Sequence, residues 1–314
     1  MTTREKMNLV LLQMADEYDI SDDSPERGDF KYSSLVCMDR SSRALYYLRA
    51  DCKGKSVLDF DVAALEASLR NNTHIADGEL NGPKLLIDPT KAYLEYTPGF
   101  LIKKPPFSGV FVKDVRLTAY GDVAAFEEWQ DYHKRELEFF EKLRDNLPDG
   151  KWHPSIACYL GCVVEDVLKN AAGAEDLRIV GIAMEEYKWT LEERVNDPEW
   201  RPLNVDKVIE DVTKALQYMH NLDYCHNDVN PFNIMLKDDD SAVLIDFDSC
   251  QLMGEQLKKG TTVEWGVGDT ISANKVSHPS TDWCGLKKVR DYLQGKGNPE
   301  LPGVPPAGCG SASG

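Results

Sequence analysis

One stretch constrains the fold and the chemistry of this chain more than any other, residues 224–248, YCHNDVNPFNIMLKDDDSAVLIDFD. It follows directly on the segment 205–221, in which Val208, Val212 and Met219 recur at a helical spacing. Apolar residues three and four apart share one face of a helix, so this segment is predicted as an amphipathic helix. The stretch behind it is predicted as a strand, a polar loop and a second strand.

The polar loop carries side chains suited to phosphoryl transfer. This reaction requires a carboxylate near the attacking hydroxyl and hard oxygen ligands that hold magnesium on the phosphates of ATP. Asp228 can serve the first purpose, and Asn233 and Asp246 the second. Asn233 offers a neutral oxygen and Asp246 a charged one, which limits crowding of carboxylates. An acidic strand–turn–strand hairpin with solvated carboxylates is the alternative.

The stretch resembles the catalytic loop and metal-binding motif of protein kinases, H-R-D-L-x-x-x-N followed by D-F-G. Residues 226–228 (HND) stand in the place of HRD, and Asn233 follows Asp228 at the family spacing of five residues. Residues 246–248 (DFD) stand in the place of DFG. The resemblance implies that Asp228 orients and deprotonates an acceptor hydroxyl and that Asn233 and Asp246 bind Mg²⁺.

The resemblance extends upstream into the expected nucleotide site. Lys113, in a strand-like FVKD, is similar to the lysine that contacts the ATP phosphates, and Glu136 is similar to the helix glutamate that holds this lysine. An exposed lysine or glutamate is more often solvated surface, so order and context carry this pairing. Residues 182–187 (IAMEEY) look like the strand and hinge that bind adenine, with Met184, Glu185 and Tyr187 at its contact positions.

Three further features are similar to the family. Phe140, one turn after Glu136, is placed where kinases pack an aromatic or aliphatic residue against the motif phenylalanine, here Phe247. Asp282 resembles the aspartate that anchors the catalytic loop, although a plain helix N-cap is the alternative. Residues 258–262 look like part of the activation segment of fungal protein-kinase-like sequences.

The chain also departs from the family pattern. No G-x-G-x-x-G loop precedes Lys113, so the phosphates are expected to lose that cover. Asn227 replaces the arginine that receives an activation-segment phosphate, which argues against that form of control. Asn230 stands where Ser/Thr kinases place a phosphate-binding lysine, and Asp248 replaces the motif glycine. The added carboxylate of Asp248 is expected to restrict the backbone and to lie near a second metal.

The fold class predicted is α+β. The resemblance implies a protein-kinase-like two-lobed fold, with an antiparallel sheet in the N-lobe and a mainly helical, truncated C-lobe. We expect an N-terminal extension of unknown role over 1–90, the N-lobe over 91–187, the C-lobe over 188–296 and a disordered Gly-, Pro- and Ser-rich tail over 297–314.

Other elements are predicted from periodicity. Residues 8–15 (NLVLLQMA) are predicted as a short amphipathic helix rather than a signal peptide, because acidic residues follow without a clear cleavage site. The acidic segment 16–29 is predicted as a loop. Helices are expected at 59–70 and 123–143, and strands at 85–87, 92–96, 100–102, 110–115, 156–163, 178–184 and 242–245.

The composition limits the classes of binding partner that we expect. The formal net charge is -17, so the surface repels nucleic-acid backbones and anionic lipids, and we expect neither nucleic acid nor membrane as a partner. No apolar run approaches the length of a membrane helix. The eight cysteines form no CxxC pair; Cys158 and Cys162, four apart, could share a helix face. Scattered thiols are typical of a reducing cytoplasm or nucleus.

Three functions remain open. The first is an ATP- and Mg²⁺-dependent kinase for protein serine or threonine. The second is a small-molecule kinase of the aminoglycoside- or choline-kinase type, which the short C-lobe and Asn230 favour. The third is a pseudokinase that binds a partner, which the missing glycine loop favours and the retained polar residues oppose.

Overall fold

A computed structural model describes residues 9–19, 29–50, 53–54, 85–167, 176–197, 202–259, 261–262, 265 and 276–295. The fold class is α+β, as predicted. The chain divides into two compact units. Unit 1 takes its described residues from Met1–Tyr96, Asp114–Asp131 and Val164–Val180, and unit 2 takes them from Thr97–Lys113, Tyr132–Val163 and Gly181–Gly314. The domain boundaries expected from the sequence stay predictions.

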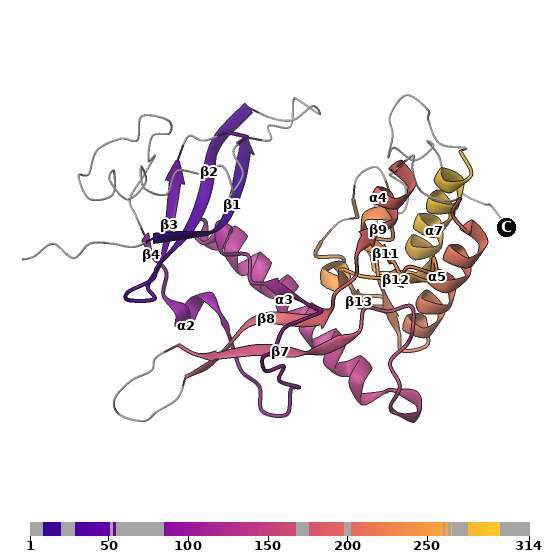
Figure 1. Ribbon diagram of the computed structural model, residues 1–314, viewed down its shortest axis with the longest axis horizontal. Coiled ribbons are helices and arrows are strands. Elements are labelled where there is room, and N and C mark those ends of the chain that lie inside the picture. The colour runs from indigo at the N-terminus through magenta and orange to yellow at the C-terminus, as the bar shows by residue number, and fades with distance from the viewer. Residues whose placement is uncertain are drawn as a thin grey trace, which may run out of the picture. The chain divides into compact units, whose positions relative to one another are not determined.

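Unit 1 contains a four-stranded antiparallel sheet of order β1-β2-β3-β4 (Figure 1). Its strands are β1 (Leu9–Asp19), β2 (Asp29–Asp39), β3 (Leu45–Ala50) and β4 (Leu85–Leu86). The register pairs Val36 with Tyr47, so both side chains point to the same face of the sheet. That face belongs to an apolar core that also includes Leu45, Ile87, Ala92, Val115, Leu117 and Phe126.

The second sheet has β8 (Leu177–Glu185) at its centre. This strand pairs with β5 (Leu94–Glu95), β6 (Val110–Asp114) and β7 (Tyr159–Asp166). The short helix α2 (Pro89–Ala92) precedes β5, and the long helix α3 (Val123–Asp145) follows β6. Lys113 therefore lies on β6 and Glu136 on α3, as the sequence predicted.

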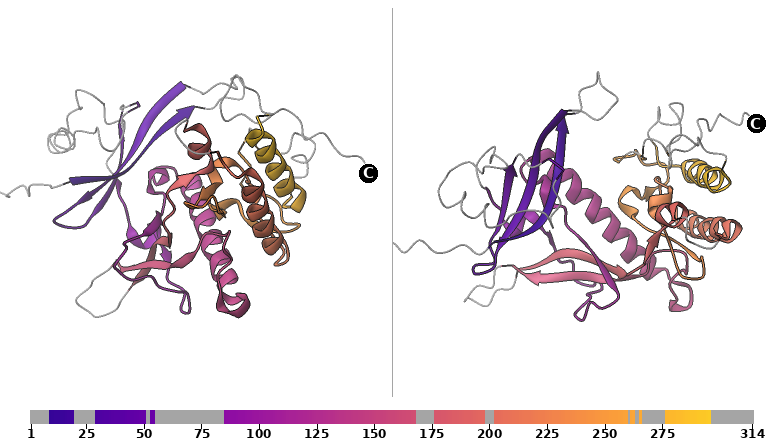
Figure 2. Two further views of the ribbon diagram at one scale, coloured as in Figure 1. Left: turned by 45° about the vertical axis from the view of Figure 1, so that its right-hand side comes forward. Right: turned by 45° about the horizontal axis from the view of Figure 1, so that its top comes forward.

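Unit 2 contains the other helices, α4 (Leu191–Asn196), α5 (Val205–His220) and α7 (Pro279–Leu293). Helices α5 and α7 run side by side (Figure 2). Helix α5 begins with an Asn204 side chain that accepts a hydrogen bond from the Lys207 backbone, and it buries the apolar stripe predicted from its spacing.

Short strands frame the catalytic-loop stretch. β10 (Tyr224–Cys225) pairs with β13 (Gln251–Leu252), and β11 (Ile234–Leu236) pairs with β12 (Ala242–Leu244). A further pairing joins β11 to β9 (Trp189–Thr190). These pairings fix both ends of the loop between β10 and β11 and the turn after β12. The predicted strand–loop–strand arrangement is confirmed.

The helix predicted at 8–15 is wrong, because residues 9–15 belong to β1, while residue 8 lies outside the described part. Leu9 and Leu11 are buried while Leu12 is exposed, so the apolar run follows the two-residue period of a strand near its start. Its partner is β2, which pairs Leu9 with Asp39. The loop predicted at 16–29 is also wrong at both ends, where residues belong to β1 and β2; residues 20–28 lie outside the described part.

Smaller differences concern the region after residue 85. Residues 100–102 form no strand; Ile102 makes a single bridge to Cys162 instead. The predicted strand at 92–96 begins in α2 and is reduced to the two residues of β5. The helix predicted at 59–70 and the tail 297–314 lie outside the described residues.

The cysteines differ from expectation at two points. Cys162 lies on strand β7 and Cys158 directly precedes it, so the two do not share a helix face. Five described cysteines have free thiols, but Cys284 on α7 is disulfide-bonded, so the expectation of reduced thiols is wrong there. Among the described residues, no helix is long and apolar enough to cross a membrane.

Candidate active site

An ion triad lies at the centre of the site, within unit 2. Lys113 Nζ is 2.7 Å from Glu136 Oε2 and 2.5 Å from Asp246 Oδ1. Glu136 is fully buried, and its other oxygen accepts a hydrogen bond from the Phe247 backbone N–H at 3.1 Å. The glutamate of α3 thus holds both the lysine of β6 and the backbone after Asp246.

The three charges shift one another's pKa values. Burial lowers the pKa of Lys113, but Glu136 and Asp246 outweigh it and raise the pKa above its ordinary value. Burial raises the pKa of Asp246, but Lys113 outweighs it and the pKa is lowered. For Glu136, burial exceeds the opposing effect of Lys113, and the pKa is raised. Lys113 and Asp246 are therefore held charged at neutral pH.

Asp246 lies at a strained turn that its neighbour stabilises. Its φ is 62°, in the left-handed region that non-glycine residues rarely adopt. The next side chain, Phe247, is fully buried, stacks on Phe139 with a centroid distance of 4.9 Å and meets Phe140 edge-on at 5.2 Å. The predicted packing of Phe140 on Phe247 is present. This aromatic cluster keeps the strained turn in place.

Asp228 is a buried carboxylate bound by several donors. Its Oδ2 accepts from Asn233 Nδ2 at 3.1 Å and from Thr262 Oγ1 at 3.0 Å. Its Oδ1 accepts from the Thr262 backbone N–H at 2.8 Å. Hydrogen bonds to a carboxylate stabilise its charged form and fix its orientation. The Thr262 hydroxyl and backbone N–H therefore hold the Asp228 carboxylate in one orientation.

Asp282 anchors the loop that carries Asp228. Its Oδ2 accepts from the His226 backbone N–H at 2.9 Å, and its Oδ1 accepts from the Asn227 backbone N–H at 2.7 Å. Its Oδ2 also lies 2.8 Å from His220 Nε2. Helix α7 is capped by His278, so Asp282 is not the N-cap, and that alternative is wrong.

Two asparagines that replace charged residues of the family pattern form hydrogen bonds with the backbone of the site. Asn227 has a φ of 65°, which asparagine tolerates better than most residues, and its Nδ2 donates to the Ser249 carbonyl at 3.0 Å. Asn230 is buried, and its Oδ1 accepts from the backbone N–H groups of Phe232 and Asn233. Both side chains therefore shape the backbone.

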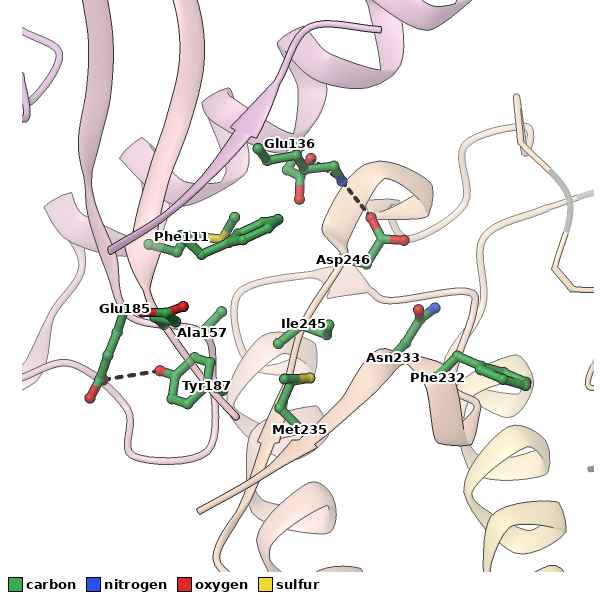
Figure 3. A pocket seen from close by; sticks show the side chains of 13 residues that line it. Phe111, Glu136, Ala157, Glu185, Tyr187, Phe232, Asn233, Met235, Ile245 and Asp246 are labelled. Atoms are coloured by element: carbon green, nitrogen blue, oxygen red, sulfur yellow. Dashed lines mark hydrogen bonds and ion pairs between the residues drawn. The ribbon is translucent and has the colours of Figure 1, made fainter. Parts of the chain in front are cut away.

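A pocket of about 390 Å³ opens beside the ion triad, within the size range of ligand sites (Figure 3). Three expected hinge residues line it: Met184, Glu185 and Tyr187. The Tyr187 hydroxyl donates to Glu185 Oε2 at 3.1 Å and accepts from the Cys158 backbone N–H at 3.1 Å. The rest of the lining is Phe111, Lys113, Glu136, Ala157, Glu186, Phe232, Asn233, Met235, Ile245 and Asp246.

The pocket contains one apolar and one charged part. Ala157, Met235 and Ile245 lie on the side of Glu185 and Tyr187, whereas Glu136 and Asp246 lie at the other end (Figure 3). Lys113 belongs to that end, because it contacts both of these acids. An apolar slot beside a paired lysine and carboxylate suits a flat ring joined to an anionic tail.

Phe111 lines the pocket just before Lys113. In the kinase pattern a glycine-rich loop precedes this lysine, and this sequence lacks it. Phe111 precedes Lys113 by two residues on β6, so both side chains point to the same face of the strand. The Phe111 side chain is 53% exposed. Nearby, the Gly109 carbonyl, at a φ of 67°, accepts from the Glu186 backbone N–H at 3.1 Å. An aromatic side chain thus forms part of the wall here.

The residues expected to bind magnesium fit such an ion. Asn233 Nδ2 donates to the carbonyl and to Oδ2 of Asp228, which leaves Oδ1 of Asn233 as an acceptor. The amide extends toward Asp246, whose side chain is 32% exposed (Figure 3). Carboxylate and amide oxygens are the hard ligands that Mg²⁺ prefers.

The structure thus brings all the predicted site residues into unit 2. Lys113, Glu136, Asn233 and Asp246 line one pocket with the hinge residues, and Asp228 is joined to it through Asn233. Sequence reasoning missed Thr262 and Phe111. Two-residue spacing from Lys113 could have found Phe111, whereas Thr262 lies 34 residues from Asp228 and no spacing signals its contact.

Comparisons with known proteins agree with this geometry. The family model described as "Protein kinase domain" matches residues 134–286, which include Glu136, the catalytic-loop stretch and Asp282. Serine/threonine-protein kinase TAO2 of Xenopus laevis is 27% identical over 165 residues, covering 51% of this chain and 14% of that protein. Human TAO2 is 27% identical over 177 residues, covering 52% of this chain and 12% of its own length.

A yeast relative matches a shorter part. Serine/threonine-protein kinase ELM1 of Saccharomyces cerevisiae is 35% identical over 70 residues, covering 19% of this chain and 11% of its own length. The chain therefore spans about one seventh or less of the length of these curated relatives. The protein-kinase-like assignment rests on the match of residues 134–286 to the domain model.

Proposed function

The chain is protein-kinase-like over residues 134–286, and we propose that it is an ATP- and Mg²⁺-dependent phosphotransferase acting on protein serine or threonine. The observation that carries the proposal is the contact of Lys113 with both Glu136 and Asp246, in a pocket that Asn233 also lines. A lysine that two acids hold beside a pocket, with a raised pKa, is a candidate for a functional site.

The proposed roles follow from these contacts. Lys113, kept charged and positioned by Glu136, binds the phosphates of ATP. Asn233 and Asp246 hold Mg²⁺, which when bound neutralises phosphate charge. Asp228 accepts the hydrogen bond of the acceptor hydroxyl and takes its proton as the oxygen attacks the terminal phosphorus. The bond from that phosphorus to the bridging oxygen breaks, and ADP leaves with the electron pair.

A protein acceptor is supported by the relatives, which are named serine/threonine-protein kinases. The cytoplasmic location expected from the sequence stays a prediction.

The test is transfer of labelled phosphate from ATP to a degenerate serine/threonine peptide library and, in parallel, to a metabolite panel. Asp228→Asn should lower transfer by roughly 10²-fold or more, because the hydroxyl loses its proton acceptor. Asp145→Asn is the matched control, since this exposed carboxylate at the end of α3 pairs with its neighbour Arg144 and does not line the pocket.

The outcomes separate the candidates. Labelled peptides in the wild type, lost in Asp228→Asn and kept in Asp145→Asn, support a protein kinase. Labelled metabolites alone would overturn the protein acceptor but keep the phosphotransferase. Equal transfer by wild type and Asp228→Asn would contradict the proposed mechanism.

A further inference from the structure

Asp248 is a charge where the kinase motif has glycine. The side chain is 9% exposed and forms an ion pair with Lys259, whose side chain is 25% exposed. Its other oxygen, Oδ1, accepts from Ser249 Oγ at 3.3 Å. Removing two charges from water is costly, so a pair this buried requires geometry that repays the cost. Asp248 was expected to lie near a second metal, and this stays a prediction; in the structure its carboxylate is paired with Lys259.

Further contacts fix the residues next to Lys259. The Tyr132 hydroxyl donates to the Lys258 carbonyl at 3.2 Å, and Lys259 Nζ lies 5.8 Å from the centre of the Tyr132 ring. The Lys258 backbone N–H donates to Gln251 Oε1 at 2.9 Å. The backbone at 258 is thus held by α3 and by β13, while the side chain at 259 is held by Asp248.

Three residues later the same segment reaches Asp228 through Thr262. Three residues span at most roughly 10 Å, so the anchor at Lys259 limits where Thr262 can lie. Thr262 gives Asp228 two of the three donors described above, and its Oγ1 also accepts from Asn230 Nδ2 at 3.3 Å. A carboxylate held this way has a fixed direction.

We propose that the Asp248–Lys259 ion pair is a clamp that positions Lys258 and Thr262, so that Thr262 orients Asp228 for the acceptor hydroxyl. Asp248 and Lys259 are positioning residues, and their effect on transfer rests on the proposed function. In many kinases a phosphate on this segment binds the motif arginine, but Asn227 offers no such cation. The Asp248–Lys259 ion pair holds the segment without that phosphate.

The first experiment measures the clamp without any phosphate transfer. Trypsin cleaves after Lys258, and cleavage requires the segment to leave its contacts. Asp248→Asn leaves the sequence around this bond unchanged and removes only the carboxylate charge, so cleavage after Lys258 should become roughly tenfold faster. The control is Glu210→Gln, which breaks the exposed Glu210–Lys214 pair on α5 and should leave the rate unchanged.

The second experiment separates positioning from folding. Asp248→Asn and Lys259→Met should lower kcat roughly tenfold and leave the KM for ATP unchanged, because the nucleotide end of the site keeps its contacts. Lys259→Arg keeps the charge and should retain most of kcat. A variant that merely unfolds would lose ATP binding as well.

Each contrary result would overturn a different part of the proposal. Unchanged cleavage after Lys258 in Asp248→Asn would overturn the clamp. Faster cleavage with an unchanged or higher kcat would overturn the positioning role and indicate that the segment blocks Asp228 instead. If the wild type transfers no phosphate, the proposed function fails, while the cleavage rates still decide whether the clamp exists.

Discussion

Units 1 and 2 bury different kinds of polar group. In the described part of unit 1, the most buried polar side chains are hydroxyls: Ser33 binds Asp16 at 2.6 Å, and Ser34 lies 3.3 Å from the Tyr47 hydroxyl. In unit 2, the buried polar groups include acids, among them Glu136 and Asp282, which are fully buried. Each of these acids is bound by a cation or by backbone N–H groups.

The two units therefore differ in the cost that their buried polar groups impose on stability. A buried hydroxyl needs one partner and loses little when neighbouring contacts are good. A buried carboxylate is costly unless paired, and replacing such pairs by apolar residues is often neutral or stabilising. The buried charges of unit 2 are therefore explained by the proposed reaction rather than by stability. Substitutions of these residues should change activity and stability by different amounts.

The largest effect is expected from Lys113→Met. This change leaves Glu136 buried without its cation, so the free energy of unfolding should fall by about 3 kcal/mol, and phosphate transfer should fall by more than about 10²-fold. The double variant Lys113→Met/Glu136→Leu removes both charges and should recover most of the stability but none of the activity. Urea unfolding and the transfer assay measure the two. Equal stability of the single and double variants would contradict this account of unit 2.

A pH effect is expected from His133 on α3. Burial, with Lys113 nearby, lowers the pKa of His133 to about 4 from its ordinary value near 6.5. Between these two pH values, His133 binds a proton in the unfolded chain but not in the folded protein. The free energy of unfolding therefore falls as the pH falls from about 6.5 to about 4.

The neutral variant His133→Gln isolates this effect from the other acids. The wild type should lose on the order of 3 kcal/mol more than the variant across that window. Urea unfolding at a series of pH values gives both curves. Parallel curves would show that His133 takes up its proton in the folded protein as readily as in the unfolded chain.

A smaller effect, on stability alone, is expected in unit 1. A Cβ on Gly121 would overlap the ring of Tyr47, which is buried and whose hydroxyl accepts from Arg49 Nε at 3.0 Å. Gly121→Ala should cost about 1–3 kcal/mol of unfolding free energy while the KM for ATP is unchanged.

Shortening the tyrosine provides the control. Tyr47→Leu removes the ring atoms that the new Cβ meets, so Gly121→Ala should cost less in that background than in the wild type. Additive costs of the two changes would show that the contact is not the cause.

The site was more predictable from the sequence than unit 1, for a physical reason. Asp228, Asn233 and Asp246 lie within one short stretch whose spacing reflects a loop between paired strands. Residues 8–15 carry a short apolar run that suits a helix or a strand, and only its pairing with β2 decides between them. Tertiary contact, rather than local pattern, fixed that element.

The same limit applies within the site. Lys113 and Glu136 were predicted from order along the chain, and they meet because α3 follows β6. The contacts of Thr262 with Asp228 and of Lys259 with Asp248 join side chains that no local period relates. Such contacts depend on the path of the whole segment and could not be predicted from spacing.

In the proposed function, Lys113, Asn233 and Asp246 form a metal–nucleotide site. The most direct test is the melting temperature of the protein titrated with ATP, with and without Mg²⁺, for the wild type and for Asp246→Ala. We expect a rise in melting temperature that requires Mg²⁺ and is lost in the variant, because ligand binding stabilises the folded state. No shift in the wild type under any condition, or an equal shift in Asp246→Ala, would contradict it.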